Sequence, residues 1–165
     1  MLRVARPADL EKLHRFEILC FREHPFRRDH IGWILGNEHA VTLVQDGLEG
    51  LTAAMMLLFE GRACRILSVG VAPRVRRRGI AMQMMRAAEA ICRERGFSSI
   101  RLEVSTRNLP AIELYRHLGY RTDGVLYGYY SWGEDAYSMG KTLLPPVAAK
   151  VSPLWTKSRI QPNKY

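Results

Sequence analysis

The sequence has few cysteines and no long hydrophobic run. Its three cysteines, Cys20, Cys64 and Cys92, are odd in number and widely spaced, which argues against a disulfide framework or a zinc site. No apolar stretch approaches the roughly 18 residues that a membrane-spanning helix needs. The first residues, MLRVARPADLEKL, lack the apolar segment and cleavage site of a secretory signal. These absences favour buried, reduced thiols and a cytoplasmic location.

Acidic residues are also scarce relative to basic ones. The chain has 16 Asp and Glu against 25 Lys and Arg, which gives a formal net charge of +9. Such a balance favours an anionic partner, which could be a nucleotide-like cofactor, a nucleic acid or a ribonucleoprotein surface. Charge alone does not choose among them. The 165 residues, 47% of them apolar, match one ordinary globular domain.

The periodicity of the chain predicts a mixed α/β domain over residues 1–144. A first helix is expected from Pro7 onward, with apolar positions that include Ile18. Further helices are expected near Ile31, after Gly79, and over Asn108–Leu118. Strands are expected over Leu2–Ala5, Ala40–Val44, Leu51–Phe59, Cys64–Val71, Ile100–Ser105, Val125–Tyr130 and Ala136–Leu143. This order predicts a mostly antiparallel sheet of about seven strands flanked by about four helices, with one central parallel pair joined by a helical crossover.

The last residues, 145–165, have a different composition from the predicted domain. They contain four of the eight prolines, four cations and no acidic residue. Such a segment cannot continue a sheet, so we expect an extended basic tail. A packed or partner-binding arm is the alternative.

A strongly basic turn lies near the middle of the chain, between Val69 and Met85. The sequence there, VGVAPRVRRRGIAMQMM, predicts an apolar strand ending at Pro73, an arginine-rich turn, and an amphipathic helix after Gly79. A turn of this kind directs backbone N–H groups and the positive end of a helix toward one point. That point is suited to binding a phosphate group.

Two polar residues are expected at the same edge of the sheet as this turn. Glu103 lies near the carboxyl end of the strand Ile100–Ser105, and Asn108 follows that strand. Ligands of α/β sheets bind at the carboxyl ends of the strands. We therefore expect Glu103 and Asn108 to lie near the ligand.

Several motifs in order resemble the GNAT superfamily, the acetyl-CoA-dependent N-acetyltransferases. The run RRRGIA, residues 76–81, is similar to the family's Gln/Arg-x-x-Gly-x-Gly/Ala motif. VGVAP before it, and LEVSTRNLPAIELYRHLGY and YYSWGEDAYSM after it, keep the family's order, which is more specific than one glycine pattern. The sequence is most similar to N-terminal α-amine acetyltransferases, including those that acetylate ribosomal proteins. The resemblance implies a single GNAT-like domain with a splayed parallel strand pair, acetyl-CoA as co-substrate and no metal.

The resemblance assigns donor binding to the basic turn and to the strand before it. It implies that the backbone amides of the turn bind the pyrophosphate of coenzyme A, and that Val69 and Val71 pair with the pantetheine arm. Asn108 matches a cofactor-side asparagine, but it would also serve as a plain helix cap. The arginines would either pair with the 3′-phosphate or form a solvated surface. The residues assigned to cofactor binding are Val69, Val71, Arg76, Arg77, Arg78, Gly79, Ile80, Ala81 and Asn108.

Two residues are candidates for proton transfer. Glu103, on the polar face of its strand, is the candidate general base, acting directly or through water; the alternative is a structural salt bridge with Arg101. Tyr115 matches the helix tyrosine that the family uses as general acid toward the coenzyme A thiolate. A phenol, with a reference pKa of about 10, keeps its proton at neutral pH and can donate it. The alternative for Tyr115 is a core aromatic residue.

The closing motif is expected to hold the acceptor. Tyr129 and Tyr130 match paired tyrosines that bind the backbone of an incoming N-terminus in the α-amine acetyltransferases, although strand propensity alone would also explain them. Glu134 and Asp135 are expected to anchor the turn between the last two strands. Phe26 is expected on the opposite wall of a peptide groove.

These assignments together predict an enzyme that moves acetyl from acetyl-CoA to a protein N-terminal α-amine by direct attack in a ternary complex. The expected acceptor is a peptide or protein N-terminus, with a ribosomal protein as one candidate, and no membrane or direct nucleic-acid role is expected. One alternative is an acetyltransferase for a small-molecule amine or an internal lysine. Another, of a different class, is a noncatalytic acyl-CoA-binding or nucleic-acid-associated module.

Overall fold

The computed structural model describes residues 1–143, so the predicted basic tail lies outside the described residues. The described strands form one sheet, and they are β1 Leu2–Val4, β2 Ala40–Gly47, β3 Gly50–Glu60, β4 Ala63–Val71, β5 Ser99–Ser105, β6 Arg121–Leu126 and β7 Ala136–Thr142. The helices are α1 Leu10–Cys20, α2 Arg28–Gly36, α3 Ile80–Glu94 and α4 Leu109–His117. Within residues 1–143 no helix is long and apolar enough to cross a membrane.

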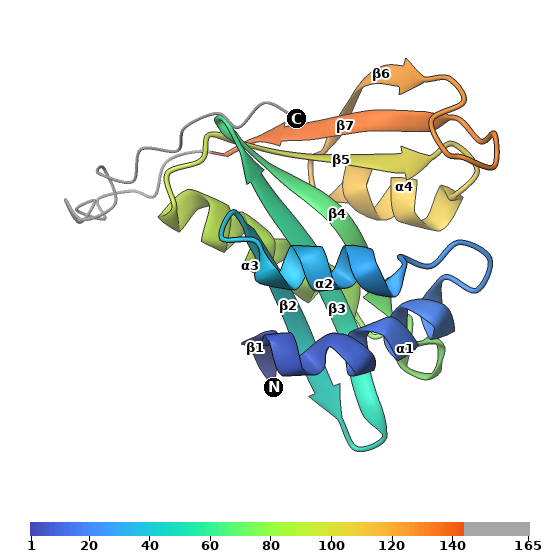
Figure 1. Cartoon of the computed structure of the whole chain (residues 1–165). Coiled ribbons are helices and arrows are strands. Elements are labelled where there is room, and N and C mark those ends of the chain that lie inside the picture. The colour runs from blue at the N-terminus through green and yellow to red at the C-terminus, as the bar shows by residue number, and fades with distance from the viewer. Residues whose placement is uncertain (144–165) are drawn as a thin grey trace.

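The sheet has the order β1-β2-β3-β4-β5-β7-β6, and its neighbours are antiparallel except for β4 and β5. This parallel pair at the centre of the sheet confirms the predicted crossover. Its register runs only from Ala63 opposite Ser99 to Ile66 opposite Leu102. Both strands continue past this point, and Figure 1 shows them diverging.

A β-bulge on β4 lies where the two strands separate. Met56 of β3 pairs with Ser68, whereas the next residue, Leu57, pairs with Ile66. Leu67 is therefore an extra residue on β4. A bulge of this kind bends its strand and increases the local twist. It turns the second half of β4 away from β5 and opens the sheet.

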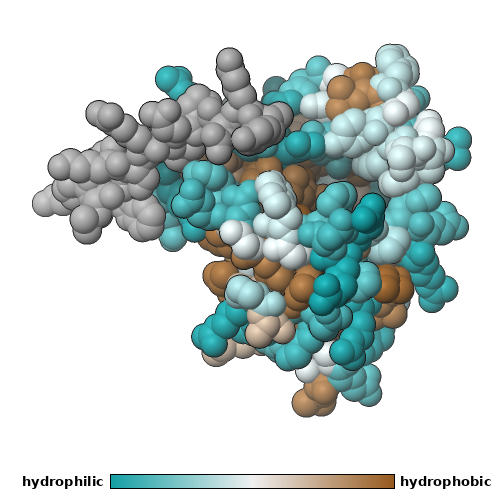
Figure 2. Space-filling view, in the orientation of Figure 1, coloured by the Kyte–Doolittle hydropathy of each residue, from teal (hydrophilic) through white to brown (hydrophobic). Residues whose placement is uncertain are grey.

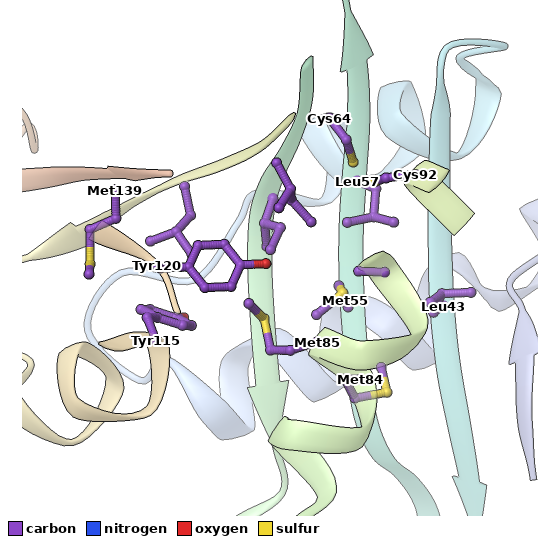
Figure 3. Close-up of a cluster of buried hydrophobic side chains, with 14 of the residues drawn as sticks. Leu43, Met55, Leu57, Cys64, Met84, Met85, Cys92, Tyr115, Tyr120 and Met139 are labelled. Atoms are coloured by element: carbon purple, nitrogen blue, oxygen red, sulfur yellow. The ribbon is translucent and has the colours of Figure 1, made fainter. Parts of the chain in front are cut away.

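Two layers of helices cover the two faces of the sheet. Strand β3 is buried on both faces, because Met55 and Leu57 pack with α3 and α4 while Ala54 and Met56 pack with α1 and α2. The amphipathic helix α3 buries Met84, Met85, Ala88 and Cys92 against the sheet, as its spacing predicted (Figure 3). The face carrying α1 and α2 is mostly hydrophilic outside, with scattered hydrophobic patches (Figure 2).

The prediction of a strand over Val125–Tyr130 was wrong in position. Strand β6 covers Arg121–Leu126, and both paired tyrosines lie in the β6–β7 loop, residues 127–135. Aromatic residues favour strands, but a left-handed glycine, Gly128 with φ of 58°, ends the pairing. The N–H of Gly128 donates to Oδ1 of Asp135 at 2.7 Å, which confirms the predicted anchoring role of Asp135.

Candidate active site

A cleft of about 1300 Å³ opens where β4 and β5 diverge. Its other walls are the α1–α2 loop, residues 21–27, the β6–β7 loop and the start of α4. The predicted site residues that line this cleft are Phe26, Val69, Arg76, Glu103, Asn108, Tyr115, Tyr129 and Tyr130. The other predicted site residues lie outside the cleft lining, at the end of β4 and in the turn and first residues of α3 that follow it. They are Val71, Arg77, Arg78, Gly79, Ile80 and Ala81. The fold therefore gathers residues from five separate segments around one cleft.

The basic turn has the backbone geometry of an anion site. Arg77 and Gly79 both have left-handed backbone, with φ of 64° and 76°. The first intrahelical bond of α3 runs from the N–H of Gln83 to the carbonyl of Gly79 at 3.1 Å, so the N–H groups of residues 80–82 precede it. Successive N–H groups in such a turn form a concave site for phosphate. Its geometry fits the predicted pyrophosphate.

Arg76 has a structural contact that the sequence did not predict. Its Nε donates to the carbonyl oxygen of Val71 at 2.9 Å, which ties the turn back to the end of β4. A side chain that also lines the cleft can hold the turn in place for the donor. Binding of a phosphate by this guanidinium stays a prediction.

Strand β4 has a backbone edge suited to an extended ligand. Val69 and Val71 pair with Met55 and Ala53 of β3 on one side. On the other side they lie beyond Ile66, the last residue in register with β5. An extended chain can add to such an edge through main-chain hydrogen bonds. The opening fits the predicted pantetheine arm.

Glu103 lies on the sheet face that carries α1 and α2, opposite its buried neighbours Leu102 and Val104. Its carboxylate pairs with Arg65 of β4 through two contacts, Nε to Oε2 and Nη2 to Oε1, each at 3.1 Å. The expected partner, Arg101, instead donates to Oδ2 of Asp123 at 2.6 Å. The alternative of a salt bridge with Arg101 was therefore wrong in its partner, because the parallel strand brings a second arginine closer.

Tyr115 belongs to both the core and the cleft. It is 7% exposed, and its ring centroid lies 6.0 Å from that of Tyr120 (Figure 3). It packs in the hydrophobic cluster beneath the sheet, on the face opposite Glu103, yet it lines the cleft at the opening. Burial raises the pKa of Tyr115 well above its usual range, with Tyr130 adding to the effect. The phenol therefore keeps its proton at neutral pH.

The asparagine before α4 acts as a helix cap. Oδ1 of Asn108 accepts the N–H of Ala111 at 3.4 Å, which confirms the capping alternative. Asn108 also lines the cleft. Its contact with a cofactor stays a prediction.

Aromatic residues join the α1–α2 loop to the β6–β7 loop at the cleft. The rings of Tyr129 and Tyr130 meet edge to face at 5.0 Å, and Tyr130 stacks on Trp132 at 4.6 Å. Trp132 in turn stacks on His24 of the α1–α2 loop at 3.6 Å. The pKa of Tyr130 is raised to about 12 by burial, with smaller contributions from Tyr129 and Glu103. Ser105 Oγ donates to Oε2 of Glu134 at 2.5 Å, so Glu134 anchors this loop as predicted.

Glu17 is a site residue that the sequence reasoning missed. We expected Ile18 among the apolar positions of α1, but Ile18 is 46% exposed and Glu17 is buried. The carboxylate of Glu17 accepts the N–H of Phe26 at 3.2 Å and the hydroxyl of Ser68 at 3.0 Å. Burial raises the pKa of Glu17. Glu17 ties the α1–α2 loop to β4. The only signal for it in the sequence is that it stands next to Ile18, a position expected to be apolar and buried.

Arg65 was missed as well. The available signal was an arginine between Cys64 and Ile66 in a strand whose other residues are mostly apolar or small. Its role depends on the register of β4 against β5, which no local pattern encodes.

The chain belongs to the acetyltransferase (GNAT) family, whose model matches residues 8–120. This membership confirms the resemblance and the GNAT-like α/β fold, and it supports the expectation of acetyl-CoA as co-substrate.

Individual relatives include proteins that differ in their acceptors. An N-alpha-acetyltransferase of Saccharolobus solfataricus is 39% identical over 83 residues, which cover 50% of each chain. A streptothricin acetyltransferase of Streptomyces lavendulae is 42% identical over 78 residues, or 45% of this chain and 41% of the relative. These matches span half or less of each relative's length.

A solved structure supports the fold over most of the chain. The ribosomal-protein-S18-alanine N-acetyltransferase of Escherichia coli superposes with a TM-score of 0.79 at 20% identity, covering 87% of this chain and 93% of that one.

Proposed function

We propose that this protein transfers the acetyl group of acetyl-CoA to the N-terminal α-amine of a protein, by direct attack in a ternary complex. The observation that carries the proposal is the cleft between β4 and β5, which Glu103, Tyr115 and Tyr130 line from three different segments. The N-alpha-acetyltransferase relative supports an α-amine acceptor. The S18-alanine acetyltransferase neighbour makes a ribosomal protein a reasonable acceptor to test.

The donor is expected to lie along the opened sheet. Its pyrophosphate binds the backbone N–H groups of the turn Arg77–Ala81, and its pantetheine arm adds to the free edge of β4 beside Val69. This path leads the thioester into the gap between Glu103 on one face of the sheet and Tyr115 on the other.

The acetyl transfer then needs two proton movements. The nitrogen of the neutral amine attacks the carbonyl carbon of the thioester and forms the new C–N bond, and the C–S bond breaks. Glu103 accepts the proton that the nitrogen loses, directly or through water, and Tyr115 donates its proton to the leaving sulfur. The proton on Glu103 returns to Tyr115 through solvent, so the products are an amide and coenzyme A thiol.

An acceptor panel tests this proposal. The full chain is mixed with acetyl-CoA and with short peptides that differ only in a free or a blocked N-terminus, and thiol release is measured. Turnover with free N-termini and none with blocked ones supports the proposal. Equal turnover with both, or no thiol release with any amine, contradicts it, and the latter result would favour the noncatalytic acyl-CoA-binding module.

A second candidate is acetylation of a small-molecule amine or an internal lysine. The match to a streptothricin acetyltransferase favours keeping it in the panel. Streptothricin and a peptide with a blocked N-terminus and one lysine are therefore included. A kcat/KM for either of them that exceeds the value for the best free N-terminus would make this candidate the better one.

A further inference from the structure

Arg65 holds the candidate base and the acceptor loop together. Its guanidinium makes the two-point contact with Glu103 described above, and its Nη2 also donates to the hydroxyl of Tyr129 at 2.8 Å. The Arg65 and Glu103 side chains are 33% and 21% exposed, so water screens the pair only in part. A paired planar guanidinium of this kind keeps its charge at any pH at which proteins function.

This pairing changes the charge that an incoming amine meets. An unpaired carboxylate would attract the ammonium form of an amine, whereas the Arg65–Glu103 pair has no net charge. Around Glu103, Tyr129 and Tyr130 come from the β6–β7 loop and Tyr115 comes from α4, and all three are phenols. From the α1–α2 side, the titratable residues that line the cleft are Glu17, Cys20, Arg22, Glu23, His24, Arg27 and His30.

The acidic members of that last group do not restore an anionic site. The carboxylate of Glu17 is buried and occupied by Phe26 and Ser68. Glu23 is exposed and is accompanied by two arginines, Arg22 and Arg27. With its charge offset by Arg65, the Glu103 carboxylate gives little net stabilisation to an ammonium group beside it.

We propose that Arg65 makes the cleft select the neutral form of the acceptor amine, and so favours α-amines over lysine. The inference rests on the proposed function and names the chemical property by which the acceptor is chosen. The amine loses its first proton to water on binding, and Glu103 takes the second proton after attack. At pH 7, an α-amine with a pKa near 7.8 is neutral roughly 300 times more often than a lysine amine with a pKa of about 10.4.

Two matched acceptors test the role of Arg65. One peptide has a free N-terminus and no lysine, and the other has a blocked N-terminus and one lysine. The ratio of their kcat/KM values at pH 7 is measured for the wild-type protein, for Arg65→Met and for Arg65→Lys. Arg65→Met is expected to lower the α-amine preference at least tenfold, while Arg65→Lys, which keeps the charge, changes it less than threefold. An unchanged ratio in Arg65→Met overturns the inference, even if both rates fall.

A second measurement uses the wild-type protein alone and needs no turnover. The free-N-terminus peptide is titrated into the protein saturated with coenzyme A at pH 6.5, by calorimetry in two buffers of different ionisation enthalpy. Release of close to one proton per bound peptide is expected, because most of the free peptide is protonated at that pH. No proton release overturns the inference. Absence of thiol release in the acceptor panel would instead count against the proposed function, so the two failures are distinguishable.

Discussion

At the scale of single residues, Tyr115 is the clearest candidate for a chemical role. Burial raises its pKa, so it carries a proton at every pH at which the protein would be assayed. Replacing Tyr115 by Phe keeps the aromatic ring and removes only the hydroxyl group that carries the proton. We expect kcat to fall by about 100-fold or more, within the usual range for general acid catalysis, while KM for acetyl-CoA stays within about twofold.

Tyr120→Phe is the matched control for this prediction. Tyr120 is the neighbouring buried tyrosine, and it does not line the cleft. Its replacement should leave kcat unchanged. If Tyr115→Phe has wild-type turnover, or if both variants lose the same amount, Tyr115 is a core residue without a role in proton transfer.

Glu103→Gln tests the candidate base. The amide cannot accept a proton from the attacking nitrogen, so we expect steady-state kcat to fall by about 100-fold with either acceptor class. Asp123→Asn is a suitable control, because Asp123 also pairs with an arginine on the sheet but lies outside the cleft lining. Equal activity of Glu103→Gln and Asp123→Asn would leave Glu103 with only its structural pair with Arg65.

At the scale of elements, the turn between β4 and α3 is the segment that we propose binds the donor. Gly79 has a φ of 76°, and a methyl group added there meets no other protein atom within 4 Å. Gly79→Ala should therefore cost roughly 1 kcal/mol of stability from the left-handed backbone. The added group would also block close approach of a phosphate, so we expect KM for acetyl-CoA to rise about tenfold, where one factor of ten corresponds to about 1.4 kcal/mol.

Gly61→Ala separates these two effects. Gly61, in the turn between β3 and β4, also has a positive φ, 57°, with open space around an added methyl group. It should show a similar loss of stability in urea unfolding, with an unchanged KM. Matching increases of KM in both variants would attribute the Gly79 effect to general destabilisation.

The bulge in β4 and the short parallel register with β5 explain why the cleft forms beside β4. A longer parallel pairing would use the N–H and carbonyl groups of Val69 and Val71 within the sheet. Because the pairing ends at Ile66 and Leu102, the edge of β4 at Val69 borders the cleft instead. The α1–α2 loop, which Glu17 ties to Ser68 of β4 through Phe26, then forms another wall of the cleft.

At the scale of the whole molecule, the N-terminal strand is attached to the sheet by an ionic cluster. Arg3 on β1 donates to both carboxylate oxygens of Asp9, at 2.8 and 2.9 Å, and to Asp46 of β2. These contacts lower the pKa of Asp9 to about 2, below its value of about 3.9 in an unfolded chain. The folded state therefore gains stability above pH 4, and this gain is lost as the pH falls toward 2.

We expect Arg3→Met to destabilise the protein at pH 7, with a smaller difference from the wild type at pH 3. Urea unfolding at the two pH values measures it. Arg74→Met is the control, because Arg74 pairs with Glu49 on an exposed surface, where such pairs contribute about 0–1 kcal/mol. A destabilisation by Arg3→Met that does not shrink with acid would assign the effect to packing of the arginine side chain.

Much of this fold could be predicted because its signals are local. The amphipathic spacing of α3, the glycine after the basic turn and the alternation in β5 each depend on residues close in sequence. The β6 prediction failed because tyrosine propensity is weak compared with a left-handed glycine that ends a strand. Ile18 was expected inside for a similar reason, since helical spacing alone does not say which neighbour faces the core.

The sequence by itself determined the class of this protein. Its ordered motifs indicated a GNAT-like domain and predicted a phosphate-binding turn before α3, because turn chemistry and helix ends are properties of short segments. Only the tertiary structure decided what Glu103 pairs with. Arg65 is 38 residues away from Glu103 in the chain and reaches it across diverging strands. Contacts of that kind depend on strand register and on the β4 bulge, which no short segment encodes.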